Sequence, residues 1–118
     1  MSRQQCGLKG VTGIFPQAIL RGVIIVKTIS VGAAKEMLEK GEAIFVDLRD
    51  PGSYGEDHIP GAVLVSDANV DDFMASTDKT QTHIVYCYHG INSLGGVAYF
   101  EENGFRDVFS MDGGFSAW

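Results

Sequence analysis

Short apolar runs alternate with stretches of helical pattern from Val23 onward. The runs are rich in β-branched and aromatic residues, which favours strands, and the stretches between them favour helices. This alternation is typical of an α/β domain with a largely parallel sheet. The pattern predicts strands at 23–29 (of which only the last residues need be strand), 43–48, 62–65, 82–87 and 107–110, and helices at 31–40, at one turn from 51, and at 69–76 and 93–103.

Residues with special backbone preferences mark the ends of these elements. Ser30 is a candidate N-cap for the first helix, and Gly41 fits the position just after its end. Pro51 suits a first helical position. Asn69 is a candidate cap for a later helix, and Gly104 is expected to stop the last one.

The chain has 118 residues, of which 45% are hydrophobic and 20% charged. This is enough for one compact domain with a real core, and it excludes a disordered or fibrous protein. No apolar run approaches the roughly 20 residues of a membrane span, so we expect no membrane partner.

Charge is unevenly distributed along the chain. The first 29 residues contain four basic residues and no acidic one, whereas the rest contains five basic and fifteen acidic residues. An acidic body argues against nucleic-acid binding, which needs a basic surface. We therefore interpret residues 1–28 as an N-terminal extension of unknown role, preceding a domain at 29–118.

Two cysteines, Cys6 and Cys87, are too few and too far apart for a disulfide framework. A reducing compartment, the cytoplasm, is the simpler interpretation. One structural disulfide stays open as an alternative.

The carboxyl ends of parallel strands share one edge of a sheet, where sites in α/β folds lie. Of the four polar strand ends, only that of Cys87 carries a strong nucleophile. If the loop after it curls around the sulfur, its amides form an anion-binding nest, and the next helix N-terminus lowers the thiol pKa. Gly90 helps such a turn. A small buried packing cysteine is the alternative.

Three motifs follow one another along the chain: 46–50 with Tyr54 and 58–62, then 87–93, and then 112–118. In this order they resemble the motifs of the rhodanese superfamily, and together they cover about residues 29–118. The resemblance implies a five-stranded parallel sheet flanked by helices on both faces. It also implies a thiosulfate sulfurtransferase that passes sulfur to cyanide or a thiol through a Cys87 persulfide.

The resemblance also implies that Cys87 is the nucleophile and that His58 gives structural support. Asp47 and Arg49 could be a catalytic acid and an electrophile, but alternation places them on the same side of the extended segment, which favours structural support. We expect no metal or cofactor to take part. The partners are thiosulfate, cyanide or thiols, with a thiol-carrying protein as a further acceptor. The substrate-binding residues are Tyr88, His89, Gly90, Ile91, Asn92 and Ser93.

Several positions depart from the family pattern. The loop offers only His89 as a basic side chain, which predicts weak binding of the thiosulfate dianion. Ile91 stands where a polar residue is usual, and Asp57 replaces a glycine. The chain stops at Trp118, so we expect the domain to lack the usual closing helix.

Two other functions, a phosphatase and a metal site, fit these residues less well. A phosphatase would need arginine where Ser93 stands. A metal site fails because His83, expected as a surface residue at a strand start, lies about 13 Å from Cys87 along the strand. The remaining alternative is a persulfide carrier that does not turn over, or a rhodanese-like interaction module.

The aromatic side chains of Phe115 and Trp118 are expected in the core.

Overall fold

The fold is built on one parallel sheet of five strands. In the computed structural model, which describes residues 26–118, the strands follow the order β2-β6-β5-β3-β4, and every neighbouring pair is parallel. The prediction of a five-stranded parallel sheet is therefore confirmed. The strands are β2 (Thr28–Ile29), β3 (Ala43–Asp47), β4 (Val63–Leu64), β5 (Thr82–Tyr86) and β6 (Asp107–Met111).

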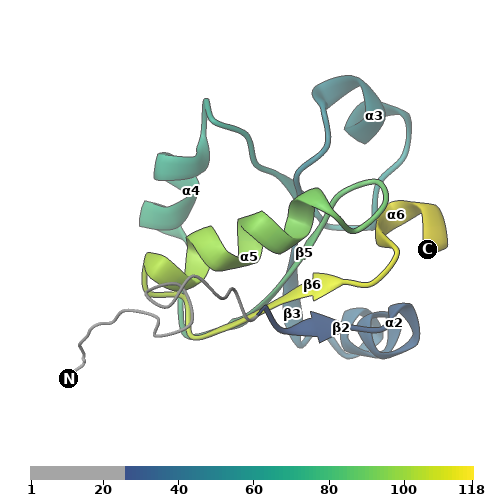
Figure 1. Ribbon diagram of the computed structural model, residues 1–118, viewed down its shortest axis with the longest axis horizontal. Helices are drawn as coiled ribbons and strands as arrows, with labels where there is room; N and C mark the ends of the chain where they lie inside the picture. The colour runs from purple at the N-terminus through teal and green to yellow at the C-terminus, as the bar shows by residue number, and fades with distance from the viewer. Residues whose placement is uncertain (1–25) are drawn as a thin grey trace.

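Helices cover both faces of the sheet. Figure 1 shows α4 and α5 on one side and α2 on the other, with α6 near the end of β5. Parallel strands need such crossovers, because the chain must return to the same edge before each new strand. The helices are α2 (Val31–Lys40), α3 (Pro51–Glu56), α4 (Val70–Ser76), α5 (Asn92–Glu102) and α6 (Gly114–Ala117).

Two apolar clusters fill the space between sheet and helices. Phe45, Ile84 and Met111 belong to the cluster on the α2 side, against which Phe115 and Trp118 pack as expected from the sequence. Val46, Val85, Val97 and Phe100 belong to the cluster on the α5 side. Alternate residues of β3 and β5 thus face opposite layers, which fixes the direction of each side chain at the strand ends.

The end signals of the first helix behave as predicted. The Ala33 amide donates to the Ser30 hydroxyl at 3.1 Å, and Gly41 ends α2 in the left-handed region at φ 67°. Asn69 behaves differently. It precedes α4, but its side chain does not cap the helix. Instead, the side-chain oxygen Oδ1 accepts a hydrogen bond from the backbone amide of Ser66, and the side-chain nitrogen Nδ2 donates one to Leu64 O.

One further prediction needs correction. His83 is fully buried, not at the surface, because Phe105 and Phe73 pack on its ring with centroids 4.8 and 6.0 Å away. The first strand comprises Thr28–Ile29, the last residues of the range predicted for it, of which 23–25 lie outside the described residues. Helix α5 begins at Asn92, within one residue of its predicted start.

Residues 26–118 include no helix that is long and apolar enough to cross a membrane.

Candidate active site

Cys87 lies just beyond the last residue of β5, at the carboxyl edge of the sheet. The loop that follows turns back over its sulfur before α5 begins. The Gly90 amide donates to Sγ at 3.1 Å and the Ser93 amide at 3.4 Å. The inward-facing amides predicted from the sequence are therefore present at these two positions. The positive ends of these two main-chain N–H dipoles therefore point at the sulfur.

The outer side of this loop is held by α6. The carbonyl oxygens of Cys87 and Tyr88 accept hydrogen bonds from the amides of Phe115 and Ser116, both at 2.8 Å. Because a trans peptide group points its C=O and N–H in opposite directions, these bonds turn the amides of Tyr88 and His89 away from α6. The loop conformation thus depends on a second segment, far along the chain. We name the 112–118 segment the clamp.

Two glycines allow the clamp and the loop to approach each other. Gly90 has φ +89°, and a Cβ there would lie 2.9 Å from the Gly113 nitrogen. Gly114 has φ +61°, and a Cβ there would overlap Cys87 O and lie 2.7 Å from the Gly90 nitrogen. Any side chain at either position would force the two backbones apart. This explains why positions 90 and 114 are both glycine.

The pKa of the Cys87 thiol is lowered from its ordinary value. Burial is the largest single effect and raises this pKa, because a thiolate loses solvation. Hydrogen bonds from the Ser93 hydroxyl and from the amides of Ser93, Gly90 and Asn92 lower it and together outweigh burial. Cys87 is 5% exposed, so little of this residue is in contact with solvent.

A pair of buried serines lies beneath the sulfur. The Ser93 hydroxyl oxygen is 3.6 Å from Cys87 Sγ and 2.7 Å from the hydroxyl oxygen of Ser110 on β6. Ser93 is fully buried and Ser110 is 1% exposed. Ser110 is the register partner of Val85, which lies two residues before Cys87. Because side chains two positions apart on a strand point to the same face, the Ser110 side chain lies under the loop.

Asp47 and Arg49 form a buried ion pair next to the loop. Arg49 Nη2 donates to Asp47 Oδ2 at 2.8 Å, with the two side chains 6% and 0% exposed. The guanidinium also donates to Asp57 O and lies 4.2 Å from the ring centre of Phe115 in the clamp. The carboxylate raises the pKa of Arg49 by hydrogen bonding and charge, against burial that lowers it. The pair thus ties β3 to α6.

His58 lies in the segment that leads into β4. Its Nδ1 donates to Tyr54 O at 2.8 Å, and the two rings stack with centroids 3.9 Å apart. The Tyr54 hydroxyl donates to Ala62 O. These contacts stabilise the conformation of residues 54–62, and none of them involves Cys87 Sγ. A supporting role for His58 stays a prediction.

The side chains of the loop form an exposed rim. Tyr88 is 53% exposed and Ile91 is 72% exposed. The rings of Tyr88 and His89 meet edge to face at 4.6 Å, and His89 and Asn92 are exposed. The rim is therefore aromatic and apolar, with His89 as the basic side chain of the loop.

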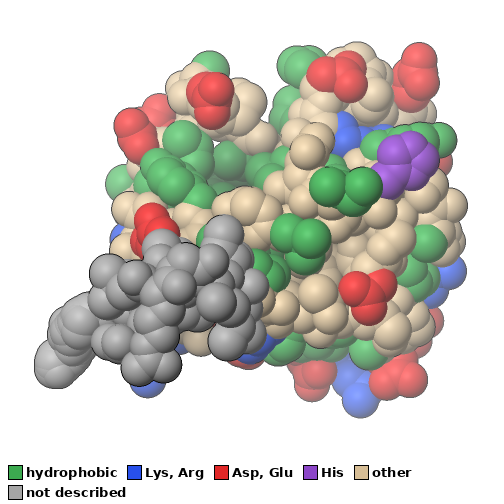
Figure 2. All heavy atoms as spheres, in the orientation of Figure 1, with side chains coloured by type: hydrophobic (Ala, Val, Ile, Leu, Met, Phe, Trp, Pro, Cys, Tyr) green, Lys and Arg blue, Asp and Glu red, His purple; other side chains and the backbone are tan. Residues whose placement is uncertain are grey.

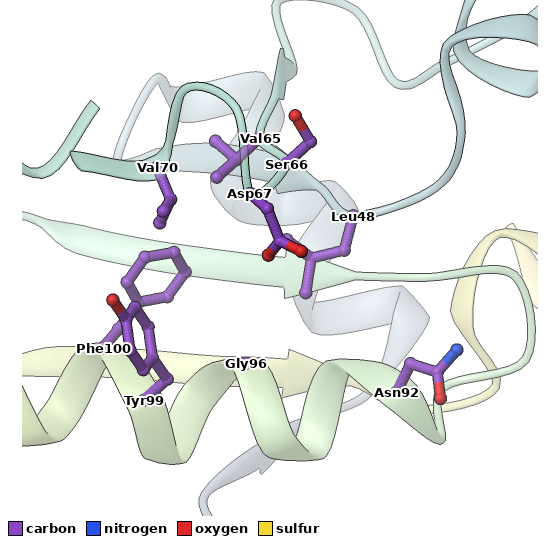
Figure 3. A pocket seen from close by; sticks show the side chains of 9 residues that line it. All are labelled: Leu48, Val65, Ser66, Asp67, Val70, Asn92, Gly96, Tyr99 and Phe100. Carbon is purple, nitrogen blue, oxygen red and sulfur yellow. The ribbon is translucent and has the colours of Figure 1, made fainter. Parts of the chain in front are cut away.

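A pocket of about 510 Å³ lies beside the loop, between the residues after β4 and helix α5. Figure 3 shows Asp67 projecting from the β4–α4 loop toward α5, with Leu48 next to it. Asn92 lies at the opposite end from Tyr99 and Phe100. Figure 2 shows hydrophobic side chains gathered over α4 and α5, around a hollow in the surface. Of the lining of this pocket, sequence reasoning identified only the polar strand end at 65–67.

Cys87 is a free thiol. Cys6, the other member of the disulfide considered as an alternative, lies outside the described residues. Within residues 26–118, no three His, Cys, Asp or Glu side chains are grouped so that they hold a metal ion.

These features define a class of protein. Residues 30–118 match the family model described as rhodanese-like domain, and the chain belongs to this family. Among solved structures, a rhodanese-like domain protein from Staphylococcus aureus superposes with a TM-score of 0.70 at 29% identity, covering 79% of this chain and 91% of that one. The rhodanese-like domain of the Anabaena Alr3790 protein gives 0.70 at 27% identity, over 80% and 74%.

The curated relatives are more specific. The chain is 47% identical over 92 residues to the thiosulfate sulfurtransferase GlpE of Pseudoalteromonas translucida, covering 78% of this chain and 88% of that protein. It is 41% identical over 92 residues to the thiosulfate sulfurtransferase GlpE of Shewanella oneidensis, covering 78% and 91%. The chain is thus homologous to GlpE over most of its length.

Sequence reasoning missed two features of the site. It read Ser110 as the end of a strand, and it read the clamp only as a motif. The two glycines in the clamp and the serine in β6 carried signals of an unusual backbone and of a polar residue in an apolar strand. Neither signal says which atoms they contact.

Proposed function

We propose that this protein is a thiosulfate sulfurtransferase that works through a persulfide on Cys87. The observation that carries the proposal is the sulfur cradle: the Sγ atom accepts from the amides of Gly90 and Ser93, at a strand end in a chain homologous to enzymes of that name. These hydrogen bonds favour the thiolate, which is the nucleophilic form of cysteine. The chemistry belongs to the domain at 29–118.

The first half-reaction forms the persulfide. The Cys87 thiolate attacks the outer sulfur of thiosulfate, a new S–S bond forms, and the old one breaks with sulfite leaving with the electron pair. The outer sulfur then carries the negative charge. The amides of Gly90 and Ser93, together with that of Asn92, suit a cradle for this charge because they are already oriented.

The second half-reaction passes the sulfur on. An acceptor, cyanide or a thiolate, attacks the outer sulfur, and Cys87 leaves as a thiolate. No net oxidation occurs, so no redox cofactor is needed. A free Cys87 thiol suits a reducing compartment such as the cytoplasm, which we include in the proposal.

The rim favours small sulfur donors bound through main-chain amides. His89 is the one basic side chain of the loop, so we expect weak affinity for the thiosulfate dianion. The exposed Tyr88 and Ile91 leave room for a thiol-carrying protein as acceptor or a protein persulfide as donor.

Intact mass spectrometry tests the proposal. After incubation with thiosulfate, the protein gains one adduct of about 32 Da, and cyanide removes it. Cys87→Ser abolishes the adduct and leaves the fold intact, while Cys6→Ser, the matched control, keeps it. An unchanged adduct or unchanged thiocyanate production in Cys87→Ser overturns the assignment.

Turnover separates an enzyme from a carrier. With thiosulfate and cyanide both in excess, an enzyme produces many equivalents of thiocyanate per Cys87, whereas a persulfide carrier stops after one. We expect many equivalents.

A further inference from the structure

Ser110 is connected to the reacting sulfur by a chain of two hydroxyl groups. Its Oγ lies 2.7 Å from Ser93 Oγ, which in turn lies 3.6 Å from Cys87 Sγ, within hydrogen-bond range for the larger sulfur atom. Both serines are buried in the layer between β6 and the start of α5. Bulk water therefore does not replace either hydroxyl as a partner.

The hydrogens of this chain can be assigned by elimination. Each hydroxyl has one hydrogen, and a thiolate accepts but does not donate. If Ser93 donated to Ser110, the thiolate would lose its hydroxyl donor, and the Ser110 hydrogen would need another buried acceptor. If Ser110 donates to Ser93, every hydrogen is used: Ser110 to Ser93, and Ser93 to Cys87 Sγ. The second arrangement leaves no buried donor unpaired.

We infer that Ser110 is a positioning residue for the sulfur-transfer reaction, which aims the Ser93 hydroxyl at the Cys87 thiolate and polarises it. The inference rests on the proposed function in one respect, since it takes the thiolate as the reacting form. The stabilisation is cooperative because a hydroxyl that accepts a hydrogen bond donates a stronger one.

Protonation of Cys87 reverses the chain. The thiol then donates to Ser93 Oγ, and Ser93 turns its hydrogen to Ser110 Oγ; no proton leaves the chain. The Ser110 hydrogen then points away from Ser93. Ser110 thus stabilises the thiolate form of Cys87 relative to the thiol, and replacing Ser110 reduces this stabilisation.

The test is the rate of Cys87 alkylation by iodoacetamide as a function of pH, followed on the Cys87 peptide because Cys6 is a second thiol. In Ser110→Ala we expect the rate at pH below the midpoint to fall about threefold, and the plateau at high pH to stay at the wild-type value. A purely structural role of Ser110 would change the plateau, through access to the sulfur, instead of the midpoint.

Two variants serve as matched controls. Ser110→Thr keeps a hydroxyl and is expected to restore the wild-type profile. Ser76→Ala removes an exposed hydroxyl that donates to Phe73 O, far from the loop, and is expected to leave the profile unchanged. The other titratable side chains in the loop and the elements packed against it include Tyr88, His89, Asp112 and the Asp47–Arg49 pair, and all variants keep them.

A double-mutant cycle separates action through Ser93 from direct action on the sulfur. In a Ser93→Ala background, Ser110→Ala is expected to leave the midpoint unchanged. It is also expected to raise the thermal midpoint of unfolding, because it removes a buried hydroxyl that has lost its partner. These comparisons stand if Ser110→Thr fails to fold.

The inference is overturned if Ser110→Ala has the wild-type profile, or if its effect persists in the Ser93→Ala background. Failure of the proposed function gives a different result. In that case thiosulfate leaves no adduct on the wild-type protein, while the alkylation profiles still shift as described.

Discussion

The amide of Phe115 donates a hydrogen bond to the carbonyl oxygen of Cys87 at 2.8 Å. This bond links the peptide group of Cys87, the proposed nucleophile, to α6, a segment 28 positions along the chain. The amide of Ser116 makes the same bond to Tyr88 O. The orientation of the sulfur cradle is therefore set by the clamp as much as by the loop itself.

Gly114→Ala tests the clamp. The new Cβ would overlap Cys87 O at a φ of +61°, so we expect loss of sulfur transfer and a thermal unfolding midpoint several degrees lower. The control is Gly95→Ala on α5, where a Cβ meets nothing within 4 Å. This control is expected to stabilise the protein by about 0.5–1 kcal/mol through helix propensity. Wild-type activity in Gly114→Ala would show that the loop keeps its conformation without the clamp.

Arg49→Met tests the buried ion pair. It leaves the Asp47 carboxylate, 0% exposed, without its cation, and we expect a loss of about 3 kcal/mol in the free energy of unfolding, measured by urea titration. Lys27→Met is the matched control, because the Lys27–Asp107 pair is 41% and 44% exposed. Its removal is expected to cost less than about 1 kcal/mol. Equal losses in the two variants would contradict a special role of burial.

Because of the buried His83, we expect the free energy of unfolding to fall in mild acid. Burial lowers the pKa of this imidazole, more than hydrogen bonding to Gln81 O raises it, so the folded state holds it neutral while the unfolded state takes up a proton near its ordinary pKa of about 6.5. Since the unfolded state binds more protons, stability declines as the pH falls through that value. Between about pH 7.5 and 5.5 the free energy of unfolding should fall more in wild type than in His83→Gln. Parallel declines would exclude His83 as the cause.

Ile91→Lys tests whether charge limits binding of the donor. Ile91 is 72% exposed on the loop, so a lysine there adds a cation without disturbing the core. We expect the KM for thiosulfate to fall roughly threefold at low salt, and the gain to vanish at high salt because exposed charges are screened. Ile91→Gln, similar in size but neutral, is the control. A KM that does not fall would show that the amides alone set the affinity.

Local signals in the sequence predicted most of the fold and the position of the candidate nucleophile Cys87 at the carboxyl edge of the sheet. Ser30 and Gly41 act within one or two turns of their own helix, so their neighbours along the chain decide their roles. Cys87 was found for the same reason: strand, loop and helix start lie within seven residues.

The other features depend on residues that are far apart in the sequence. Phe73 and Phe105 bury His83 from two different segments, so a polar residue at a strand start gives no sign of its burial. Ser110 contacts Ser93 only because α5 packs over β6. Asn69 has the residue type of a cap, but the turn before α4 offers its side chain the amide of Ser66 instead.

The sulfur cradle consists largely of backbone atoms, whereas the exposed rim of the loop consists of the side chains of Tyr88, His89 and Ile91. If Cys87 is the nucleophile as proposed, its activation and the choice of sulfur donor depend on different atoms. Substitutions along the rim are then expected to change the preferred donor without altering the cradle, which makes this loop a convenient starting point for engineering.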